Sequence, residues 1–448
     1  MRRMMTRAGL AALLLGLSGL LPAAPVTVEH TLANGLKVVV REDRRAPLVV
    51  VQLWYRVGSS YEPDGLTGIS HALEHMMFKG TTRVPGDEFS RIVALFGGQD
   101  NAFTAGDYTT YYQIYTADKL ALALELEADR MRNIVLRPED VAQEMRVVME
   151  ERRQRTDDNP QARAFERFQV LARLTSPARQ PTVGWMRDLE AMTLDDLQAW
   201  YDRWYAPNNA TLVVAGDVDA PAVLALAERF FGGIAARPLP ASRLPRELEE
   251  PGDRRLTLRL PGKVPALYLG YNVPSRQTGQ PGEAEALRLL VGVLDEGYSA
   301  RLETRLVREQ GVAAAVNSGY DPFARGDALF VVTAVPAPGR TLDELEAAVL
   351  AEIEALKTEP VTPAELDRVY AGLLAADVFS RDSVREQATV IGRLESVGVS
   401  WRMADEWPQL LRAVPAEQVQ AAARRWLVPG RRSVLRLEPE ALMQEVRR

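Results

Sequence analysis

One stretch of the sequence occurs twice, and this repetition constrains the fold more than any other feature. Residues 193–216, TLDDLQAWYDRWYAPNNATLVVAG, align with residues 415–438, PAEQVQAAARRWLVPGRRSVLRLE. Each copy has the pattern of a helix, a turn that contains proline, and a strand. We therefore expect two copies of one α+β unit. The matched positions pair Leu197 with Val419, Gln198 with Gln420, Arg203 with Arg425, Trp204 with Trp426, Pro207 with Pro429, and Leu212 with Val434.

The beginnings of the two halves also correspond. The segment HTLANGLKVVVRED with the following LVVVQLWYRVG resembles DRRLTLRLPGK with the following PALYLGYNVP, and each predicts two short strands around a turn. Between the halves, residues 237–254 are rich in proline and arginine and lack periodicity, which is typical of an extended linker. We predict one domain over 25–236 and a homologous domain over 255–448, each a mainly antiparallel sheet packed with helices.

The first 24 residues have the pattern of a secretory signal. Three arginines precede an apolar run from Ala8 to Leu21, and small residues follow it. The alternative is an uncleaved membrane anchor, but the run is shorter than the roughly 20 residues that span a bilayer and contains Gly16 and Gly19. No later apolar run is long enough to span a membrane. We expect a periplasmic or secreted protein without a stable membrane span once residues 1–24 are removed.

Composition limits the chemistry of the chain. It contains no cysteine, which excludes disulfides, a cysteine nucleophile and cysteine-ligated zinc or iron. Any metal must therefore be bound by carboxylates and by the three histidines. The formal net charge is −6, and loss of the three arginines of the signal segment lowers it to −9. An acidic surface does not favour a nucleic-acid partner.

Two of the three histidines lie in one predicted helix. Thr67 is a candidate cap for a helix that continues through Phe78, and His71 and His75 then lie one turn apart with Glu74 on the same side. Two neutral imidazoles can bind zinc, and a carboxylate that is not a ligand can deprotonate water. The alternative is a pair of ordinary core or surface histidines, which requires no third ligand elsewhere.

A third zinc ligand is predicted on the later helix that contains Glu144, Glu150 and Glu151. Glu144 and Glu151 lie seven residues apart at the edge of the inward apolar stripe of this helix, whereas Glu150 points away from it. The pattern favours Glu151 as the ligand and Glu144 as a group that orients a ligand or adjusts the local charge. The alternative for both is a solvated, charged helix face.

These separated motifs resemble the pitrilysin/insulinase family of inverted-motif zinc peptidases, and in particular half-size bacterial members similar to the β subunit of mitochondrial processing peptidase. The family's His-x-x-Glu-His motif is matched by residues 71–75, HALEH, and its distal glutamate by Glu151, which lies 76 residues after His75. Glu144 matches a further glutamate of the family, and residues 97–104, GGQDNAFT, match its Gly-Gly-x-x-Asn-Ala-aromatic-Thr strand. The resemblance covers essentially the whole mature chain.

The resemblance implies a zinc-dependent endopeptidase with one Zn²⁺ per subunit. In that case His71, His75 and Glu151 bind the metal, and Glu74 is the general base that removes a proton from the attacking water. Glu144 is implied as a second catalytic residue. In this family an extended peptide joins the free edge of a strand near the site, so backbone hydrogen bonds bind the substrate.

Candidate substrate contacts also follow from the resemblance. Asn101, Ala102 and Phe103 match the substrate-binding strand. The alternative for the side chains of Asn101 and Ala102 is a purely structural role in a turn and at the start of a strand. Active relatives carry an Arg and a Tyr in their C-terminal half. Arg308 matches the Arg, with an ordinary solvated arginine as the alternative, whereas Ala314 occupies the position expected of the Tyr.

The missing tyrosine bears on the partner and the function. Half-size relatives form dimers, and in some of them one subunit binds zinc while a paralogous subunit supplies the Arg and Tyr. The resemblance therefore implies such a heterodimer, or otherwise a homodimer. One hypothesis is an endopeptidase that acts on peptides or unfolded segments; the other is a catalytically silent scaffold or core subunit of a hetero-oligomeric complex. The complete set of His71, Glu74, His75 and Glu151 favours the enzyme, because a scaffold does not need it.

Overall fold

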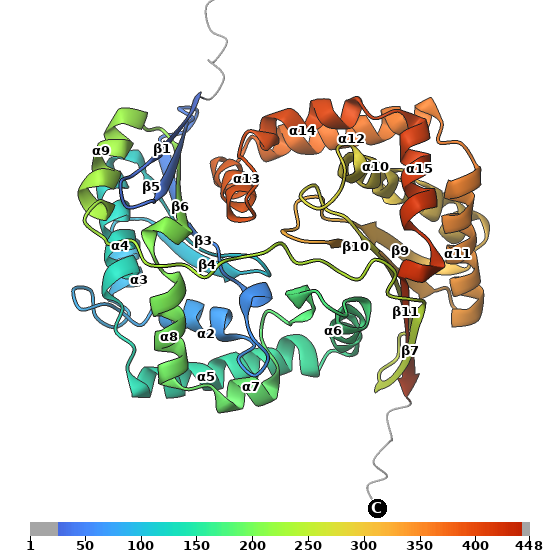
Figure 1. Ribbon diagram of the computed structural model, residues 1–448, viewed down its shortest axis with the longest axis horizontal. Helices are drawn as coiled ribbons and strands as arrows, with labels where there is room; N and C mark the ends of the chain where they lie inside the picture. Colours follow the sequence, from blue (N-terminus) through green and yellow to red (C-terminus); the bar gives the residue numbers. More distant parts are fainter. Residues whose placement is uncertain (1–25, 441–448) are drawn as a thin grey trace, which may run out of the picture.

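The computed structural model describes residues 26–440, and these form two halves, each with its own sheet and core (Figure 1). The predicted signal segment, residues 1–24, lies outside the described residues. Among the helices of residues 26–440, none has the length and apolar character needed to cross a bilayer. The expected α+β class with two similar units is confirmed.

The first half contains a six-stranded sheet in the order β1-β2-β6-β3-β5-β4. Neighbouring strands are antiparallel except β2 and β6, which are parallel. All of β6 and nearly all of β3 are buried, so both faces of the sheet centre are covered. The strands are β1 (Val26–Thr31), β2 (Lys37–Glu42), β3 (Leu48–Tyr55), β4 (Gln99–Thr104), β5 (Thr109–Thr116) and β6 (Ala210–Gly216).

The helices of the first half begin with ordinary local signals. Proline occupies the first turn of α5, α6 and α9, and Thr193 forms a capping box with Asp196 at the start of α8. The helices are α2 (Ile69–Met76), α3 (Glu88–Leu95), α4 (Leu120–Asn133), α5 (Pro138–Arg152), α6 (Pro160–Ala172), α7 (Met186–Ala191), α8 (Leu194–Trp204) and α9 (Ala220–Phe231).

The second half repeats this topology. Its sheet has the order β7-β11-β8-β10-β9, which corresponds to β2-β6-β3-β5-β4, and the single parallel pair recurs as β7 and β11. The repeated sequence forms α8 and β6 in the first half and α15 and β11 in the second. The elements are β7 (Arg254–Pro261), β8 (Ala266–Val273), β9 (Ala313–Gly319), β10 (Ala328–Pro336), β11 (Arg432–Glu440), α10 (Glu283–Asp295), α11 (Leu342–Thr358), α12 (Pro363–Ser380), α13 (Val384–Ser396), α14 (Met403–Arg412) and α15 (Ala416–Trp426).

Each half places one helix on the sheet of the other. Helix α6 packs against β7, β8 and β11, and the Phe168 ring lies 5.9 Å from that of Tyr268. Helix α13 packs against β3 and β6, where Ile391 and Trp54 share one buried cluster (Figure 1). The two halves are therefore joined by two apolar interfaces. The division into domains at 25–236 and 255–448 stays a prediction, and α6 from the first range lies on the second sheet.

The segment between the halves has no regular secondary structure, and its role as an extended linker stays a prediction. It forms no helix or strand until β7 begins at Arg254. Asn208 Nδ2 donates to the Arg237 carbonyl at 2.8 Å, which ties the start of the segment to the first half. Near its end, the Glu247 backbone N–H donates to Asp327 Oδ2 at 2.8 Å in the second half.

Helix α2 begins one residue later than the sequence indicates and ends at Met76 rather than Phe78. Thr67 is not its cap, because its hydroxyl donates to Asp188 Oδ2 at 2.5 Å. The capping position is Gly68, whose φ of 87° lies in the left-handed region that favours glycine. Glu62 satisfies the first backbone N–H groups of α2 instead.

Helix α13 gives a test of the interface between the halves. A Cβ on Gly392 would lie 2.1 Å from Trp54 Nε1, whereas a Cβ on the exposed Gly372 of α12 meets no atom within 4 Å. We expect Gly392→Ala to lower the free energy of unfolding by about 1–3 kcal/mol through overpacking. The matched control Gly372→Ala should raise it by about 0.5–1 kcal/mol through helix propensity. Thermal unfolding midpoints measure both changes, and a Gly392→Ala variant as stable as Gly372→Ala would contradict the close packing.

Glu62 gives a test of the start of α2 that depends on pH. Its carboxylate accepts the backbone N–H groups of Gly68 at 2.7 Å and Ser70 at 2.9 Å. Burial, only partly opposed by these hydrogen bonds, raises the pKa of Glu62 from 4.5 to about 7. The folded chain thus holds this proton more tightly than the unfolded chain, so the contribution of Glu62 to stability is full below pH 4.5 and is lost as the pH rises through about 7.

We expect the wild-type chain to lose up to about 3 kcal/mol of stability over this pH range from Glu62 alone. Glu62→Gln removes the titrating group and should flatten that part of the pH profile, measured as unfolding midpoints between pH 4 and pH 8. Glu190→Gln, at an exposed position of α7, serves as the control and should keep the wild-type profile. Identical profiles for wild type and Glu62→Gln would contradict the assignment.

Candidate metal centre

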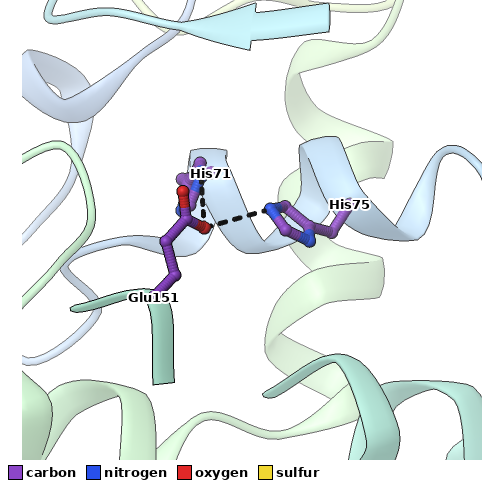
Figure 2. Close-up of side chains that lie close together, drawn as sticks. All are labelled: His71, His75 and Glu151. Atoms are coloured by element: carbon purple, nitrogen blue, oxygen red, sulfur yellow. Dashed lines mark ion pairs between the residues drawn. The ribbon is translucent and has the colours of Figure 1, made fainter. Parts of the chain in front are cut away.

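Three predicted ligands converge at one point. His71 and His75 lie on successive turns of α2, and Glu151 comes from the last turn of α5, which packs against α2. One ligand atom of each lies within 4.8 Å of the other two. Glu151 Oε2 is 3.5 Å from His71 Nε2 and 3.6 Å from His75 Nε2 (Figure 2). The structure thus brings together the residues that the helix patterns selected.

The geometry of these atoms fits a zinc ion. A tetrahedral zinc about 2.0–2.1 Å from each ligand atom holds these atoms about 3.4 Å apart. The two distances to Glu151 Oε2 are close to this value and longer than a normal hydrogen bond. Two imidazole nitrogens and one carboxylate oxygen are also the donor set of many catalytic zinc sites.

Both imidazoles are held in states suited to metal binding. Burial lowers the pKa of His71 to about 3, with further contributions from His75 and Arg155, so the His71 ring is neutral at ordinary pH. His75 Nδ1 lies 3.1 Å from Glu144 Oε2, and Lys79 Nζ lies 2.5 Å from the other oxygen of that carboxylate. Glu144 therefore orients the His75 ring so that Nε2 faces Glu151.

Glu74 lies beside the three ligand atoms without being one of them. Thr104 Oγ1, at the end of β4, donates to Glu74 Oε2 at 2.5 Å. Burial raises the pKa of Glu74, and the hydrogen bond from Thr104 opposes that rise. Helix α2 therefore supplies two imidazoles that face Glu151 and a separate buried carboxylate, that of Glu74.

Sequence reasoning missed three residues that contact this group. Thr104 belongs to the matched strand motif, yet its bond to Glu74 depends on where β4 lies over α2. Lys79, which lies just after the end of α2, pairs with Glu144 of α5. Arg155 Nη1 lies 2.6 Å from Glu151 Oε1, and this i,i+4 spacing is the one signal that the sequence itself carried.

The metal-facing residues open onto a cavity of about 1310 Å³ between the two halves. The first half contributes Asn101, Ala102 and Phe103 of β4 to its wall, and the second half contributes residues of β9 and β10. Strand β4 is the last strand of its sheet and pairs only with β5 among the described strands. Its free edge is thus available beside the metal-facing atoms.

The other candidate, Arg308, lies apart from this cavity. It is exposed in the π-helical segment Glu303–Glu309, where its guanidinium lies 4.0 Å from the centre of the Tyr298 ring and donates to the Tyr298 carbonyl at 2.8 Å. Neither Arg308 nor the exposed Ala314 belongs to the cavity wall. The structure therefore does not bring Arg308 to the metal-facing residues within this chain.

Models of two protein families match the sequence. The family described as "Insulinase (Peptidase family M16)" matches residues 37–184, which contain every metal-facing residue named above. The family described as "Peptidase M16 inactive domain" matches residues 191–373, which contain none of them. The first match lies within the first half, whereas the second begins at residue 191, before α8 of the first half, and ends within α12 of the second.

Individual relatives agree with these matches. The chain is 32% identical over 373 residues to "Zinc protease PqqE" of Helicobacter pylori, covering 82% of this chain and 80% of that protein. It is 31% identical over 407 residues to an uncharacterised zinc protease of Mycobacterium leprae, covering 89% and 88%. The crystal structure of a protease from Helicobacter pylori superposes with a TM-score of 0.87 at 28% identity, over 93% of this chain and 100% of that one. The chain therefore belongs to the insulinase family of peptidases, family M16.

Proposed function

We propose that the chain is a zinc-dependent endopeptidase that hydrolyses peptide bonds in peptides or unfolded segments. The observation that carries the proposal is the convergence of His71 Nε2, His75 Nε2 and Glu151 Oε2, with Glu74 beside them and bound to none of them. The names of the relatives as zinc proteases support the same class of reaction.

The residues of the site have separate roles in this proposal. Bound zinc, one ion per chain, supplies a Lewis acid that polarises the substrate carbonyl and activates water. His71, His75 and Glu151 hold it through the atoms named above. Thr104 holds Glu74 Oε2, while Glu74 Oε1 takes a proton from the attacking water and passes it to the leaving nitrogen. Glu144 positions His75 and contacts no substrate.

The substrate binds as an added strand along β4. The backbone of β4 has a free edge on the cavity wall, and an extended peptide there gains main-chain hydrogen bonds of the kind that join strands in a sheet. Asn101 Oδ1 accepts the Ala102 backbone N–H at 2.8 Å, which fixes that side chain, and Phe103 is 36% exposed toward a bound peptide. Thr104 then links the bound strand to Glu74.

A catalytically silent scaffold subunit is the second candidate, because Ala314 removes a hydroxyl and Arg308 lies off the cavity wall. A site shared between two subunits would account for both the missing hydroxyl and the complete metal centre; we call this a composite site. We propose that the chain is exported through its N-terminal segment and pairs with a paralogous subunit that carries the Arg and Tyr, or otherwise with a second copy of itself. Tyr320, which lies on the cavity wall and donates to the Pro274 carbonyl at 2.7 Å, is the internal alternative to that Tyr.

The roles of the ligands and the base can be separated by mutation. We expect His71→Ala and Glu151→Gln to lose zinc, measured by metal analysis after dialysis. Glu74→Gln should retain one zinc per chain and lose about 10²-fold to 10⁴-fold in kcat/KM on a fluorogenic peptide, because a general base contributes this much. Glu150→Gln is the control, since Glu150 is exposed and pairs with Arg153. Full zinc occupancy in both ligand variants, or undiminished hydrolysis by Glu74→Gln, would overturn the assignment.

The composite site can be tested by adding the paralogous subunit to the purified chain. One missing donor to the tetrahedral intermediate typically costs about 10²-fold to 10³-fold in rate, and a partner's Tyr should restore it. We expect this chain alone to hydrolyse an unstructured peptide weakly. Adding one paralogous subunit per chain should raise the rate of hydrolysis by this factor. If the chain is fully active without the paralogous subunit and loses activity in Tyr320→Phe, the homodimer is supported instead. If the chain binds zinc but hydrolyses no peptide, with or without that subunit, the scaffold is supported.

A further inference from the structure

The cavity wall carries one arginine without a carboxylate partner, and we propose that Arg173 binds an acidic side chain of the peptide substrate. This inference rests on the proposed peptidase function and adds the chemical class of the substrate to it. It concerns a position outside the metal centre, directly after α6, the helix that packs on the sheet of the second half.

Nearly all other charges on the wall are paired. Among the arginines, Arg155 pairs with Glu151 at 2.6 Å, and Arg179 lies 3.8 Å from Asp64. Arg173 has no carboxylate oxygen within 4.0 Å among residues 26–440. Five wall carboxylates have a basic partner within 3.2 Å, and the sixth, Glu74, is bound by Thr104. The five are Glu151, Asp107, Glu166, Asp321 and Asp327.

The carboxylates nearest to Arg173 are already occupied. Asp107 and Glu247 act on its charge from beyond ion-pair distance. Asp107 Oδ1 accepts from Arg325 Nε at 3.1 Å, and Glu247 accepts the backbone N–H groups of residues 174–176. Moving either carboxylate onto Arg173 would break these bonds, so residues 26–440 supply no counterion for it.

Arg173 is nevertheless held in place for a ligand. It follows the last residue of α6, and its Nη1 donates to the side-chain oxygen of Gln169 one turn earlier. Gln169 is neutral and leaves most of the five N–H donors of the guanidinium for another acceptor. Burial lowers the pKa of Arg173 to about 10, so the group remains charged at neutral pH in surroundings that disfavour a lone charge. A carboxylate, which the guanidinium can bind with two parallel hydrogen bonds, relieves that cost.

The position of Arg173 relative to β4 makes the ligand a side chain of the substrate. Thr104 at the end of β4 contacts Glu74, and Asp107 follows three residues later. Three residues of extended chain span at most about 11 Å. Arg173, residues 101–104 of β4 and the metal-facing residues line the same cavity, so a peptide bound along β4 shares that cavity with Arg173.

Matched peptide pairs test this assignment. One member carries Asp or Glu at a single position within four residues of the scissile bond, and the other carries Asn or Gln there. We expect kcat/KM of the zinc-loaded chain, with its partner subunit present if the activity requires it, to favour the acidic peptide by about 10-fold to 100-fold at one position. Arg173→Gln should reduce this ratio to near one, and Arg173→Lys should restore part of it.

Arg163→Gln is the matched control. Arg163 lies on α6, ten residues before Arg173, but not on the cavity wall, so its removal changes the net charge equally and should leave the ratio at the wild-type value. Wild-type ratios near one at every position, or a ratio that survives Arg173→Gln, would overturn the proposal.

A binding measurement separates this inference from the proposed function. The zinc-loaded Glu74→Gln chain is titrated with the same labelled peptides, and Kd is obtained by fluorescence anisotropy. Tighter binding of the acidic peptide that depends on Arg173 supports the acidic subsite even if the wild-type chain hydrolyses nothing, in which case the peptidase proposal alone fails. Equal binding of both peptides, or no binding of either, overturns the subsite.

Discussion

Each half of the chain covers one face of the other half's sheet with a helix, and the rest of the structure depends on this exchange. Helix α13 buries Ala388 and Ile391 against Val213 of β6, and α6 buries Phe168 among residues of the second sheet. Separation of the halves would expose both apolar faces to water, at roughly 25 cal/mol per Å². The cavity between the halves is therefore held open at a defined width by the packing that also stabilises the two sheets.

Polar contacts extend this arrangement to the strand proposed to bind substrate. Arg325 of the second half is 7% exposed; its guanidinium lies 4.0 Å from the centre of the Tyr61 ring and bonds to Ser60 and Asp107 of the first half. Breaking a buried charge pair leaves an uncompensated charge, which is costly. Because Asp107 follows β4 directly, this contact ties the end of β4 to the second half. The position of the free edge thus depends on residues more than 200 positions away in the sequence.

The two halves divide the chemistry between them. Both helices that carry metal-facing residues, α2 and α5, belong to the first half, and their contact is independent of the cavity's other wall. The second half has the same topology without such residues, and its strands β9 and β10 complete the cavity. The metal-facing residues therefore come from the first half alone, whereas the cavity needs both halves.

Much of this structure follows from local patterns in the sequence. The repeat over 193–216 and 415–438 predicted the duplicated helix, turn and strand, and helical periodicity selected His71, Glu74, His75 and Glu151, because residues three, four or seven apart share one side of a helix. Such spacings depend only on backbone geometry, and each site helix keeps that geometry whatever packs around it.

Tertiary structure alone decided which surfaces meet. The apolar faces of α6 and α13 are visible in the sequence, but periodicity does not say which sheet covers them, and each lies on the sheet of the other half. The start of α2 differs from the prediction because Glu62 folds back onto its first N–H groups. Arg173 looks like any other arginine in the sequence. It lacks a counterion because the neighbouring carboxylates of Asp107 and Glu247 are bound by other groups, and only the folded chain determines these contacts.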